Sequence, residues 1–155
     1  MKILAPAAIL CAFTAAALAQ PQNHAAIEKE VLAVNAQMTR AAEDRDIDRL
    51  FSFMLPNDRG SIIQSGNLFQ TREDAHATVK RGFQGIASIK YRWKRKMVTV
   101  LSPTAALLVS DGESELRTAQ DPPAIIVTPF AQTVLFVLTE GQWKALHGHT
   151  STPPR

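Results

Sequence analysis

The second half of this 155-residue chain reads as four long β-strands joined by short connections, and this pattern constrains the fold more than any other feature. The strands are expected over four segments: about residues 88–101, 105–118, 125–139 and 142–150. Turn-forming residues lie between them: 102–104, a longer segment around 121–123, and 140–141. Long strands with such short connections predict a curled antiparallel meander.

Helical patterns precede these strands. From residue 24 to residue 42, apolar residues recur at steps of three and four, which lays one apolar stripe along a helix. A second, shorter helix is expected after Asp46, a favourable N-cap, and Pro56 stops it. A hairpin over residues 61–70 follows, and Thr71 opens a third helix. This order predicts an α+β fold in which three N-terminal helices pack on a curled, mainly antiparallel sheet.

The N-terminus has the features of a secretory signal peptide. Lys2 supplies a positive charge, an uncharged apolar run extends from residue 3 to residue 18, and Ala17 and Ala19 form a small-x-small pattern that signal peptidase accepts. We therefore expect a signal peptide over residues 1–19 and a secreted or periplasmic mature protein. An uncleaved membrane anchor is the rival interpretation, but the apolar run is shorter than the ~20 residues that span a bilayer.

Cleavage there would leave one domain over residues 20–151, without a membrane segment, and a short disordered tail over residues 152–155. Cys11 is the only cysteine and lies within the apolar run, so the mature chain would have neither disulfides nor a thiolate metal site. The formal net charge is +3 at pH 7, and losing Lys2 lowers it to +2. So mild a charge does not indicate a nucleic-acid partner.

A basic segment over residues 90–96 is interleaved with two aromatic residues. It could bind single-stranded nucleic acid through phosphate contacts and base stacking, or it could be an ordinary strand with a solvated face. A loop of two or four residues at Pro103-Thr104 would set each basic residue opposite an acidic one: Lys96 opposite Asp111, Lys94 opposite Glu113 and Arg92 opposite Glu115. With that loop length, the pattern predicts a mutually neutralising surface ladder and no nucleic-acid partner.

The other face of the same strand would carry Tyr91, Trp93, Arg95 and Met97, opposite small residues of the next strand. Two large aromatic rings facing small residues can leave room for a ligand. Arg95 would be a lone cation among apolar groups there, which is costly unless it is paired or binds an anion. Alternatively, Arg95 lies near the edge of the sheet and extends its charge to water.

The final strand carries the most specific pattern in the chain. Residues 141–151 read GQWKALHGHTS, in which a Gly-x-Trp turn leads to a His-x-His-x-Ser ending. This segment resembles the closing strand of SnoaL-like proteins, which belong to the nuclear transport factor 2-like superfamily, and the order of elements over most of residues 24–152 is similar as well. The resemblance implies a cystatin-like α+β cone whose helices and curled sheet enclose a small-molecule pocket. It also implies a dimer formed through the outer face of the sheet.

Catalytic members of that superfamily include isomerases, dehydratases, cyclases and epoxide hydrolases. They typically rely on a buried aspartate, or on a carboxylate paired with histidine or arginine. Here Asp111, Glu113 and Glu115 fall on the expected outward row. Asp58 is the one carboxylate that could lie near a pocket rim, but its position after Pro56-Asn57 favours a turn residue. The departure from the family pattern weakens any transfer of a proton-abstraction mechanism.

The two histidines of the final strand are expected to face the interior. Side chains alternate across a strand, so Trp143, His147 and His149 would share one side. The turn at residues 140–141 would then place His147 near Val134 and His149 near Gln132.

These imidazoles have three possible roles. They could be hydrogen-bonded structurally to the backbone or to Gln132, or one could bind or protonate a ligand. They could also ligate a metal, but a third ligand is needed. His76 is expected on a helix beside Asp74 and exposed, so no metal site is predicted.

The opposite side of the last two strands carries Leu135, Val137 and Leu146, and it is more apolar than a solvated face should be. This apolar patch predicts a homodimer through the outer face of the sheet.

These features predict an exported protein that binds a small, partly apolar molecule in a cone-shaped pocket, without a cofactor. Six residues are predicted to line the site: Tyr91, Trp93, Arg95, Gln132, His147 and His149. The aromatic rings would bury the apolar body of the ligand, and the polar groups would orient its polar end. Two alternatives remain open: an acid–base enzyme (isomerase, dehydratase or hydrolase) that uses His147 or His149, and an interaction module that works through its outer sheet face.

Overall fold

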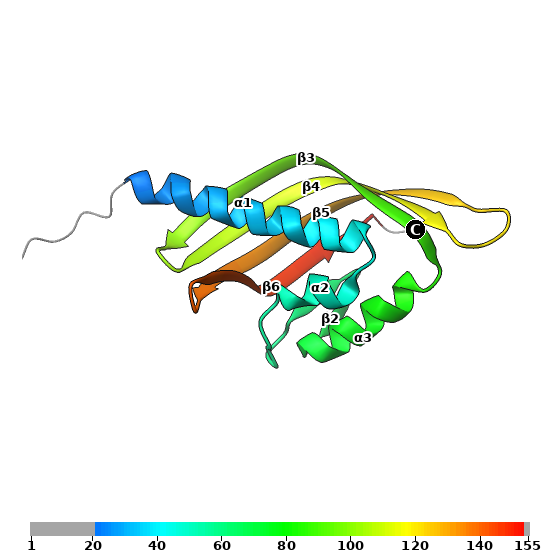
Figure 1. The fold of residues 1–155 in the computed structure, drawn as a ribbon, viewed down its shortest axis with the longest axis horizontal. Helices are drawn as coiled ribbons and strands as arrows, with labels where there is room; N and C mark the ends of the chain where they lie inside the picture. The colour runs from blue at the N-terminus through cyan, green and yellow to red at the C-terminus, as the bar shows by residue number, and fades with distance from the viewer. Residues whose placement is uncertain (1–20, 154–155) are drawn as a thin grey trace, which may run out of the picture.

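The computed structural model describes residues 21–153 (Figure 1). Within this range the chain forms three helices: α1 (Pro21–Glu43), α2 (Ile47–Ser52) and α3 (Arg72–Phe83). The same residues form six strands: β1 (Ile62–Gln64), β2 (Asn67–Phe69), β3 (Ile86–Ser102), β4 (Ala105–Thr118), β5 (Ile125–Thr139) and β6 (Gln142–Ser151). None of the helices in this part of the chain is long and apolar enough to cross a membrane. The signal peptide predicted over residues 1–19 lies outside the described residues.

The described strands form one sheet in the order β2-β1-β6-β5-β4-β3. Neighbouring strands are antiparallel except β1 and β6, which are parallel. Figure 1 shows the long strands curling behind α1, α2 and α3, so that the helices of residues 21–153 cover one face of the sheet. We call this the inner face and the opposite one the outer face. The predicted α+β class, with N-terminal helices on a curled and mainly antiparallel sheet, is confirmed.

Local signals in the sequence set the beginnings of the short helices. Asp46 caps α2, because its carboxylate accepts the backbone N–H of Arg49 at 2.9 Å. Thr71 caps α3, where its hydroxyl accepts the backbone N–H of Asp74 at 3.0 Å and lies 2.7 Å from the Asp74 carboxylate. Each cap satisfies a backbone donor that the helix itself leaves unpaired.

The hydrophobic core lies between the helices and the inner face. Val31 of α1, Leu108 of β4 and Phe136 of β5 are fully buried and belong to one cluster. Trp143 of β6 joins the same cluster, and its indole N–H donates to the carboxylate of Glu30 at 2.8 Å. This hydrogen bond ties the last strand to α1 across the core.

Single extra residues interrupt the pairing of the long strands. Those that bear on the candidate site are Lys94 and Leu101 in β3 and Leu146 in β6. Because successive side chains of a strand point to opposite faces, each such bulge moves the residues beyond it to the other face. The bulges therefore decide which side chains reach the inner face.

Gly112 of β4 permits the close backbone approach at the Lys94 bulge. It lies opposite Trp93, and a Cβ atom at this position would collide with the carbonyl oxygen of Arg92. Only a residue without a side chain fits there without displacing the neighbouring backbone.

Candidate functional site

The bulge at Lys94 determines which cation of β3 reaches the inner face. Beyond it, Lys96 pairs with Ser110, and its ammonium nitrogen lies 4.0 Å from the centroid of the Trp93 ring. This distance is within the range of a cation–π contact. Lys96 is half-buried, and burial lowers its pKa. The ion pairs formed among the described residues do not include Lys96.

The prediction that Arg95 shares the face of Trp93 is wrong. Arg95 pairs with Asp111, and its guanidinium donates to both oxygens of that carboxylate, at 2.9 and 3.0 Å. The Lys94 bulge is the physical reason, because it shifts the alternation of side chains by one residue. Arg95 therefore lies on the charged outer row, and Lys96 occupies the inner position expected for Arg95.

A row of polar residues crosses the inner face from one edge of the sheet to the other. Directly paired residues of neighbouring strands share a face. The register aligns one residue of each strand, in the order β3-β4-β5-β6-β1-β2: Lys96, Ser110, Gln132, Thr150, Gln64 and Asn67. We call these six residues the polar row. On β4, Ser110 of the polar row lies between two residues of the same face: the buried Leu108 and Gly112, which is the partner of Trp93.

Tyr91, Trp93 and Phe130 form an aromatic cluster beside the polar row. The rings of Tyr91 and Trp93 are stacked, with centroids 6.0 Å apart, and the Phe130 ring meets them edge-on at 5.9 and 5.2 Å. Burial, with a smaller contribution from the charge of Glu43, raises the pKa of Tyr91 to about 12. Its phenol is therefore neutral at physiological pH. Of the predicted lining residues, Tyr91, Trp93 and Gln132 do lie on one face.

Several buried polar atoms in the described residues have no hydrogen-bond partner. They are the indole nitrogen of Trp93, the hydroxyls of Ser110 and Ser61, and the amide oxygen of Asn35. Ser110 is 1% exposed and Asn35 is 3% exposed. Leaving such an atom unpaired costs about 1–3 kcal/mol, and each one calls for a physical explanation. A ligand that pairs with them would remove that cost.

The course of α1 brings Asn35 close to the Lys94 bulge. The carboxylate of Glu43 accepts the backbone N–H of Tyr91 at 2.9 Å, and α1 runs antiparallel to β3 (Figure 1). Asn35 precedes Glu43 by eight residues, which is about 12 Å of helix. The same length of strand contains roughly four residues. Asn35 is therefore level with the part of β3 around residue 95, near the Lys94 bulge.

The predicted register of β6 is correct up to Ala145 and wrong beyond Leu146. The bulge at Leu146 pairs His147 with Leu135 and His149 with Thr133, in place of Val134 and Gln132. One extra residue turns both imidazoles toward the outer face. The expectation that these two histidines share an enclosed space with Trp93 is therefore wrong.

Each histidine has a different environment on that side. Nδ1 of His147 lies 2.8 Å from the carbonyl oxygen of Gly60, a contact that ties β6 to the loop before β1. His149 is exposed. Within residues 21–153, no three histidine, cysteine or acidic side chains are grouped so that they could hold a metal ion.

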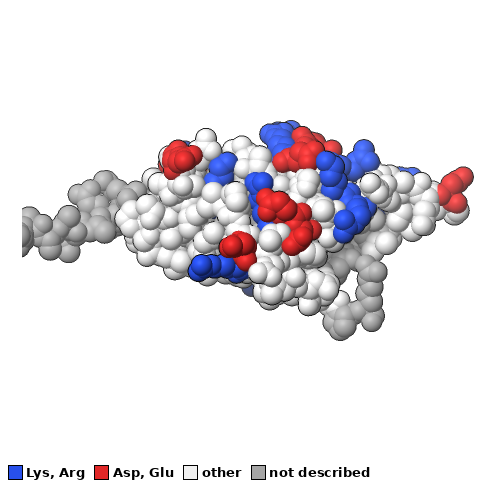
Figure 2. Space-filling view, turned by 90° about the horizontal axis from the view of Figure 1, so that it is seen from below, with Lys and Arg blue, Asp and Glu red and all other residues white. Residues whose placement is uncertain are grey.

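The basic residues of β3 and the acidic residues of β4 form a ladder on the outer face. Arg92 pairs with Glu115, Lys94 with Glu113 at 2.7 Å, and Arg95 with Asp111 at 2.9 Å. Arg92 and Lys94 form ion pairs with their predicted partners, but the predicted register is wrong: Arg92 lies directly opposite Glu113 and reaches Glu115 diagonally, and Lys94 is the bulged residue. In the third pair Arg95 takes the place expected for Lys96. Figure 2 shows acidic and basic side chains beside one another on another face of the molecule. Such mutual neutralisation favours a solvated surface over a nucleic-acid interface.

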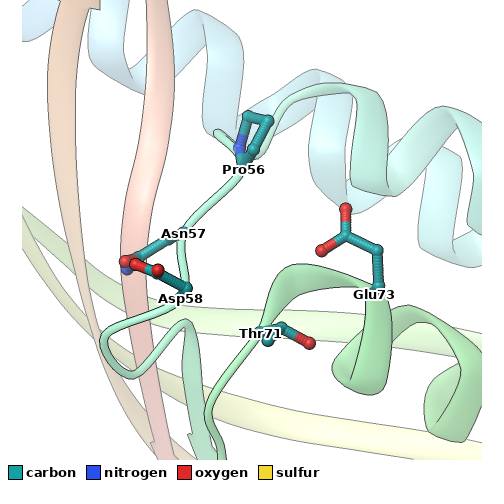
Figure 3. A pocket seen from close by; sticks show the side chains of 5 residues that line it. All are labelled: Pro56, Asn57, Asp58, Thr71 and Glu73. Carbon is teal, nitrogen blue, oxygen red and sulfur yellow. The ribbon is translucent and has the colours of Figure 1, made fainter.

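An open hollow lies at the beginning of α3. It has a volume of about 290 Å³, and Figure 3 shows its lining: Pro56, Asn57, Asp58, Thr71 and Glu73. Asp58 thus lies at the rim of a hollow. Its side chain is 87% exposed and lies 4.0 Å from that of Arg59, so nothing about its surroundings prepares it for proton transfer.

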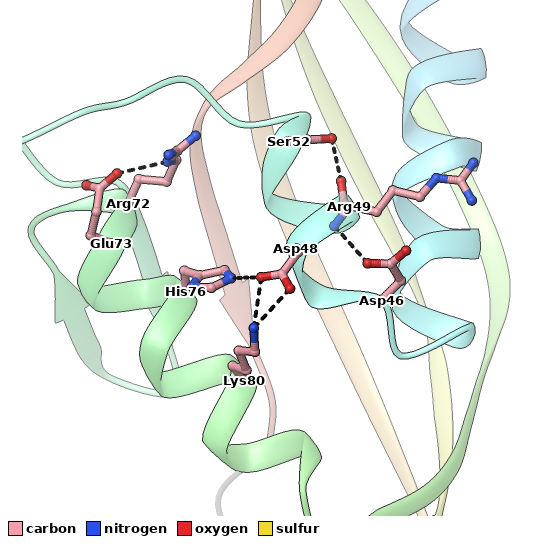
Figure 4. Close-up of polar contacts among 8 residues, drawn as sticks. All are labelled: Asp46, Asp48, Arg49, Ser52, Arg72, Glu73, His76 and Lys80. Atoms are coloured by element: carbon pink, nitrogen blue, oxygen red, sulfur yellow. Dashed lines mark hydrogen bonds and ion pairs between the residues drawn. The ribbon is translucent and has the colours of Figure 1, made fainter.

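A second hollow, of about 400 Å³, lies between α2 and α3 and includes Asp48, Phe51 and His76. Oδ1 of Asp48 lies 2.7 Å from Nε2 of His76, and Oδ2 lies 2.9 Å from Nζ of Lys80 (Figure 4). The hydrogen bond from Lys80, followed by the one with His76, lowers the pKa of Asp48. His76 lies on α3, as predicted, but it is half-buried where an exposed side chain was expected.

Four residues of the inner-face site are absent from the set predicted from the sequence: Asn35, Lys96, Ser110 and Phe130. Phe130 could have been found, because it lies two residues before the predicted lining residue Gln132 on the same strand and therefore shares its face. Residue alternation in the sequence did not indicate that Lys96 faces inward, because its orientation depends on the bulge at Lys94. Asn35 interrupts the apolar stripe of α1, and a buried polar residue in such a stripe is a sign of a specific role.

Residues 31–155 match the family of SnoaL-like domains. No curated protein matches the chain. Solved structures with a similar fold include a nuclear transport factor 2-like superfamily protein from Salmonella enterica, with 12% identity, a TM-score of 0.74, and coverage of 85% of this chain and 94% of that one. A proposed scytalone dehydratase from Novosphingobium aromaticivorans has 14% identity and a TM-score of 0.73, with 87% and 89% covered.

A hexachlorocyclohexane dehydrochlorinase, LinA type 2, is also similar in structure. It has 11% identity, a TM-score of 0.72, and coverage of 87% of this chain and 90% of that one. At such low identities these likenesses show a shared fold and nothing finer.

Proposed function

This chain belongs to the family of SnoaL-like domains, and on that premise we propose that it binds a small, partly apolar molecule on the inner face of the sheet. The binding place is the border between the aromatic cluster and the polar row. The observation that carries the proposal is the set of buried polar atoms that lack a hydrogen-bond partner among residues 21–153: Trp93 Nε1 and Ser110 Oγ at this border, and Asn35 Oδ1 on α1. Polar groups of a ligand would pair with them, while the rings of Trp93 and Phe130 would cover its apolar body.

The comparisons support a small-molecule ligand over a macromolecular one. Two of the similar structures are named for reactions of small organic compounds, one as a dehydratase and one as a dehydrochlorinase.

A thermal-shift screen of small aromatic and alicyclic compounds tests the site. Compounds that raise the melting temperature of the native protein should lose most of that effect in Trp93→Ala. His24→Ala is the matched control, because this exposed imidazole side chain lies on α1 and on neither face of the sheet. Stabilisation that survives in Trp93→Ala, or is lost only in His24→Ala, would place the ligand elsewhere.

A second candidate function is acid–base catalysis in the hollow between α2 and α3. It is favoured by the 2.7 Å contact between Asp48 and His76, since a carboxylate can orient an imidazole for proton transfer. The lowered pKa of Asp48 keeps this carboxylate ionised and able to stabilise an imidazolium. Turnover of a screened substrate that His76→Gln abolishes and Trp93→Ala leaves intact would establish this function and refute the first.

We also propose export. The support is the N-terminal sequence, in which Lys2, the apolar run and Ala19 fit a cleavable signal. Expression of the full chain in a bacterium, followed by N-terminal sequencing of the periplasmic and secreted fractions, should yield protein that begins at Gln20. Recovery of the intact N-terminus from the membrane fraction would contradict cleavage.

Finally, we propose a homodimer formed through the outer face. One row of that face is aligned by the register as follows: Met97, Val109, Thr133, His149, Ile63 and Leu68. Met97, Val109 and Leu68 are 53%, 37% and 64% exposed, which is unusual for large apolar side chains in a sheet. Association of two copies would cover them, and the neutral ion-pair ladder beside them would not oppose it.

A further inference from the structure

We propose that Lys96 makes the inner-face site selective for acidic ligands: small molecules whose carboxylate binds the Lys96 ammonium while a flat apolar body lies against Trp93 and Phe130. The inference rests on the proposed function and adds to it the chemical class of the ligand. It depends on the Lys94 bulge, which turns Lys96 inward.

The charge of the polar row is the first step. Lys96 is the only ionised member, because the other five carry hydroxyls or amides: Ser110, Gln132, Thr150, Gln64 and Asn67. The row therefore carries a single positive charge. A half-buried cation is stabilised by an anion that enters its surroundings, since burial alone disfavours the charged form.

The protein does not provide that anion among its described residues. Of the acidic residues on α1, Glu30 accepts the indole N–H of Trp143 and Glu43 accepts the backbone N–H of Tyr91. Across the sheet, Asp111 is engaged by Arg95 on the outer face. The Trp93 ring gives Lys96 a cation–π contact, typically about 0.5–2 kcal/mol, which is less than a buried charge needs.

The groups around Lys96 include donors that a carboxylate could use. The indole N–H of Trp93 can only donate, and the hydroxyl of Ser110 can donate as well as accept. Both atoms are buried and lack a hydrogen-bond partner in the part of the chain that the structure describes. A carboxylate has two oxygens with several acceptor positions, so it can bind the ammonium and one or both of these donors together. A neutral amide would bring N–H donors of its own and gain less from the positive charge.

The aromatic cluster favours a flat body on the ligand. The Phe130 ring stands edge-on to the stacked Tyr91 and Trp93 rings, and Gly112 between Trp93 and Phe130 adds no side chain. Planar apolar groups pack well against such rings. Aromatic carboxylates combine this body with the required charge.

Calorimetric titration of the full folded domain tests the inference with matched probes: benzoate, cinnamate and indole-3-acetate, each beside its primary amide. We expect the carboxylates to bind at least about tenfold more tightly than the amides. Lys96→Met, which keeps a flexible apolar chain, should remove this preference, and Lys96→Arg should restore most of it. Lys90→Met is the control, because Lys90 lies on the same strand but is exposed.

The outcomes separate the two proposals. A carboxylate preference that persists in Lys96→Met overturns the inference, and so does equal binding of acids and amides. Equal binding that disappears in Trp93→Ala would still support the proposed function. If neither acids nor amides bind up to their solubility limits, the inference is refuted and the inner-face site loses its support. Lys96→Arg guards against a folding defect in Lys96→Met, because it makes a comparable substitution while retaining the charge.

Discussion

The ammonium nitrogen of Lys96 lies 4.0 Å from the centroid of the Trp93 ring, on the helix-covered side of the sheet. The two residues are three apart in sequence, and on a regular strand they would point to opposite faces. They meet because the bulge at Lys94 shifts the alternation by one residue. This local irregularity creates a site where a cation, an aromatic ring and an unpaired hydroxyl adjoin.

Removing the unpaired hydroxyl of Ser110 should stabilise the protein in the absence of ligand. Its oxygen is buried and has no hydrogen-bond partner within the described residues, so Ser110→Ala removes a group that costs about 1–3 kcal/mol to bury. We expect the free energy of unfolding in urea to rise by about 1 kcal/mol. Ser114→Ala is the control, since that hydroxyl donates to the Thr128 carbonyl at 3.4 Å and its loss should not stabilise. A clear loss of stability in Ser110→Ala would mean that the hydroxyl has a partner.

Gly112 should be intolerant of a side chain. A Cβ atom there would collide with the Arg92 carbonyl oxygen, and the backbone at the bulge would have to move. We expect Gly112→Ala to lower the free energy of unfolding by about 1–3 kcal/mol, the usual range for overpacking. Gly148→Ala makes the same change in β6 where no atom lies within 4 Å, and it should be close to neutral. Similar stabilities of the two variants, measured by urea denaturation, would contradict the bulge geometry.

The contact between Asp48 and α3 should make stability depend on acid pH. Hydrogen bonds from Lys80 and His76 lower the pKa of Asp48 below its ordinary value of 3.8. Its contribution to stability is therefore complete above that value and is lost as the pH falls through the lowered pKa. We expect Asp48→Asn to reduce the melting temperature at pH 7, with the difference from the native protein vanishing at the acid end of a pH series.

Asp44→Asn is a suitable control for that series, because Asp44 is exposed and its side chain has no ion pair among the described residues. It should leave the melting temperature nearly unchanged at every pH. A difference in melting temperature between Asp48→Asn and the native protein that stays constant down to strong acid would contradict the prediction. It would show that the charge of the Asp48 carboxylate does not cause the stabilisation.

The outer face should control the oligomeric state. Val109→Glu places a charge in the middle of the exposed apolar row, and we expect it to convert a dimer into a monomer. Light scattering after size exclusion measures the mass directly. Gln37→Glu, on the exposed side of α1, introduces the same charge elsewhere and should leave a dimer intact. A native protein with the mass of one chain over a wide concentration range would refute the proposed dimer.

The sequence predicted the elements and their order well because these depend on local signals. The caps Asp46 and Thr71 and the two-residue turn Pro103-Thr104 all act where they were expected to act. The face on which each side chain lies was predicted less well. One extra residue at a β-bulge moves all following side chains to the opposite face, while the length of the strand hardly changes.

Bulges account for both kinds of result. The two bulges at Leu101 and Lys94 together return Arg92 to its predicted face but move its direct partner by two residues, from Glu115 to Glu113, so that Arg92 reaches Glu115 diagonally. Arg95 and Lys96 lie between the two bulges and exchange faces. A single bulge at Leu146 turns His147 and His149 outward. A bulge depends on the fit of two strands to each other and to the curled sheet, so residue alternation within one strand does not reveal it.

The indole N–H resonances of the protein test the central claim most directly. The chain has two tryptophans, and the N–H of Trp143 is already bound to Glu30, whereas that of Trp93 has no partner among residues 21–153. Adding a compound that stabilises the protein should shift the Trp93 indole signal in ¹H–¹⁵N spectra, with Trp93→Phe used for assignment, and should leave the Trp143 signal in place. A bound compound that leaves the Trp93 signal unmoved would contradict the claim that ligands bind on the inner face.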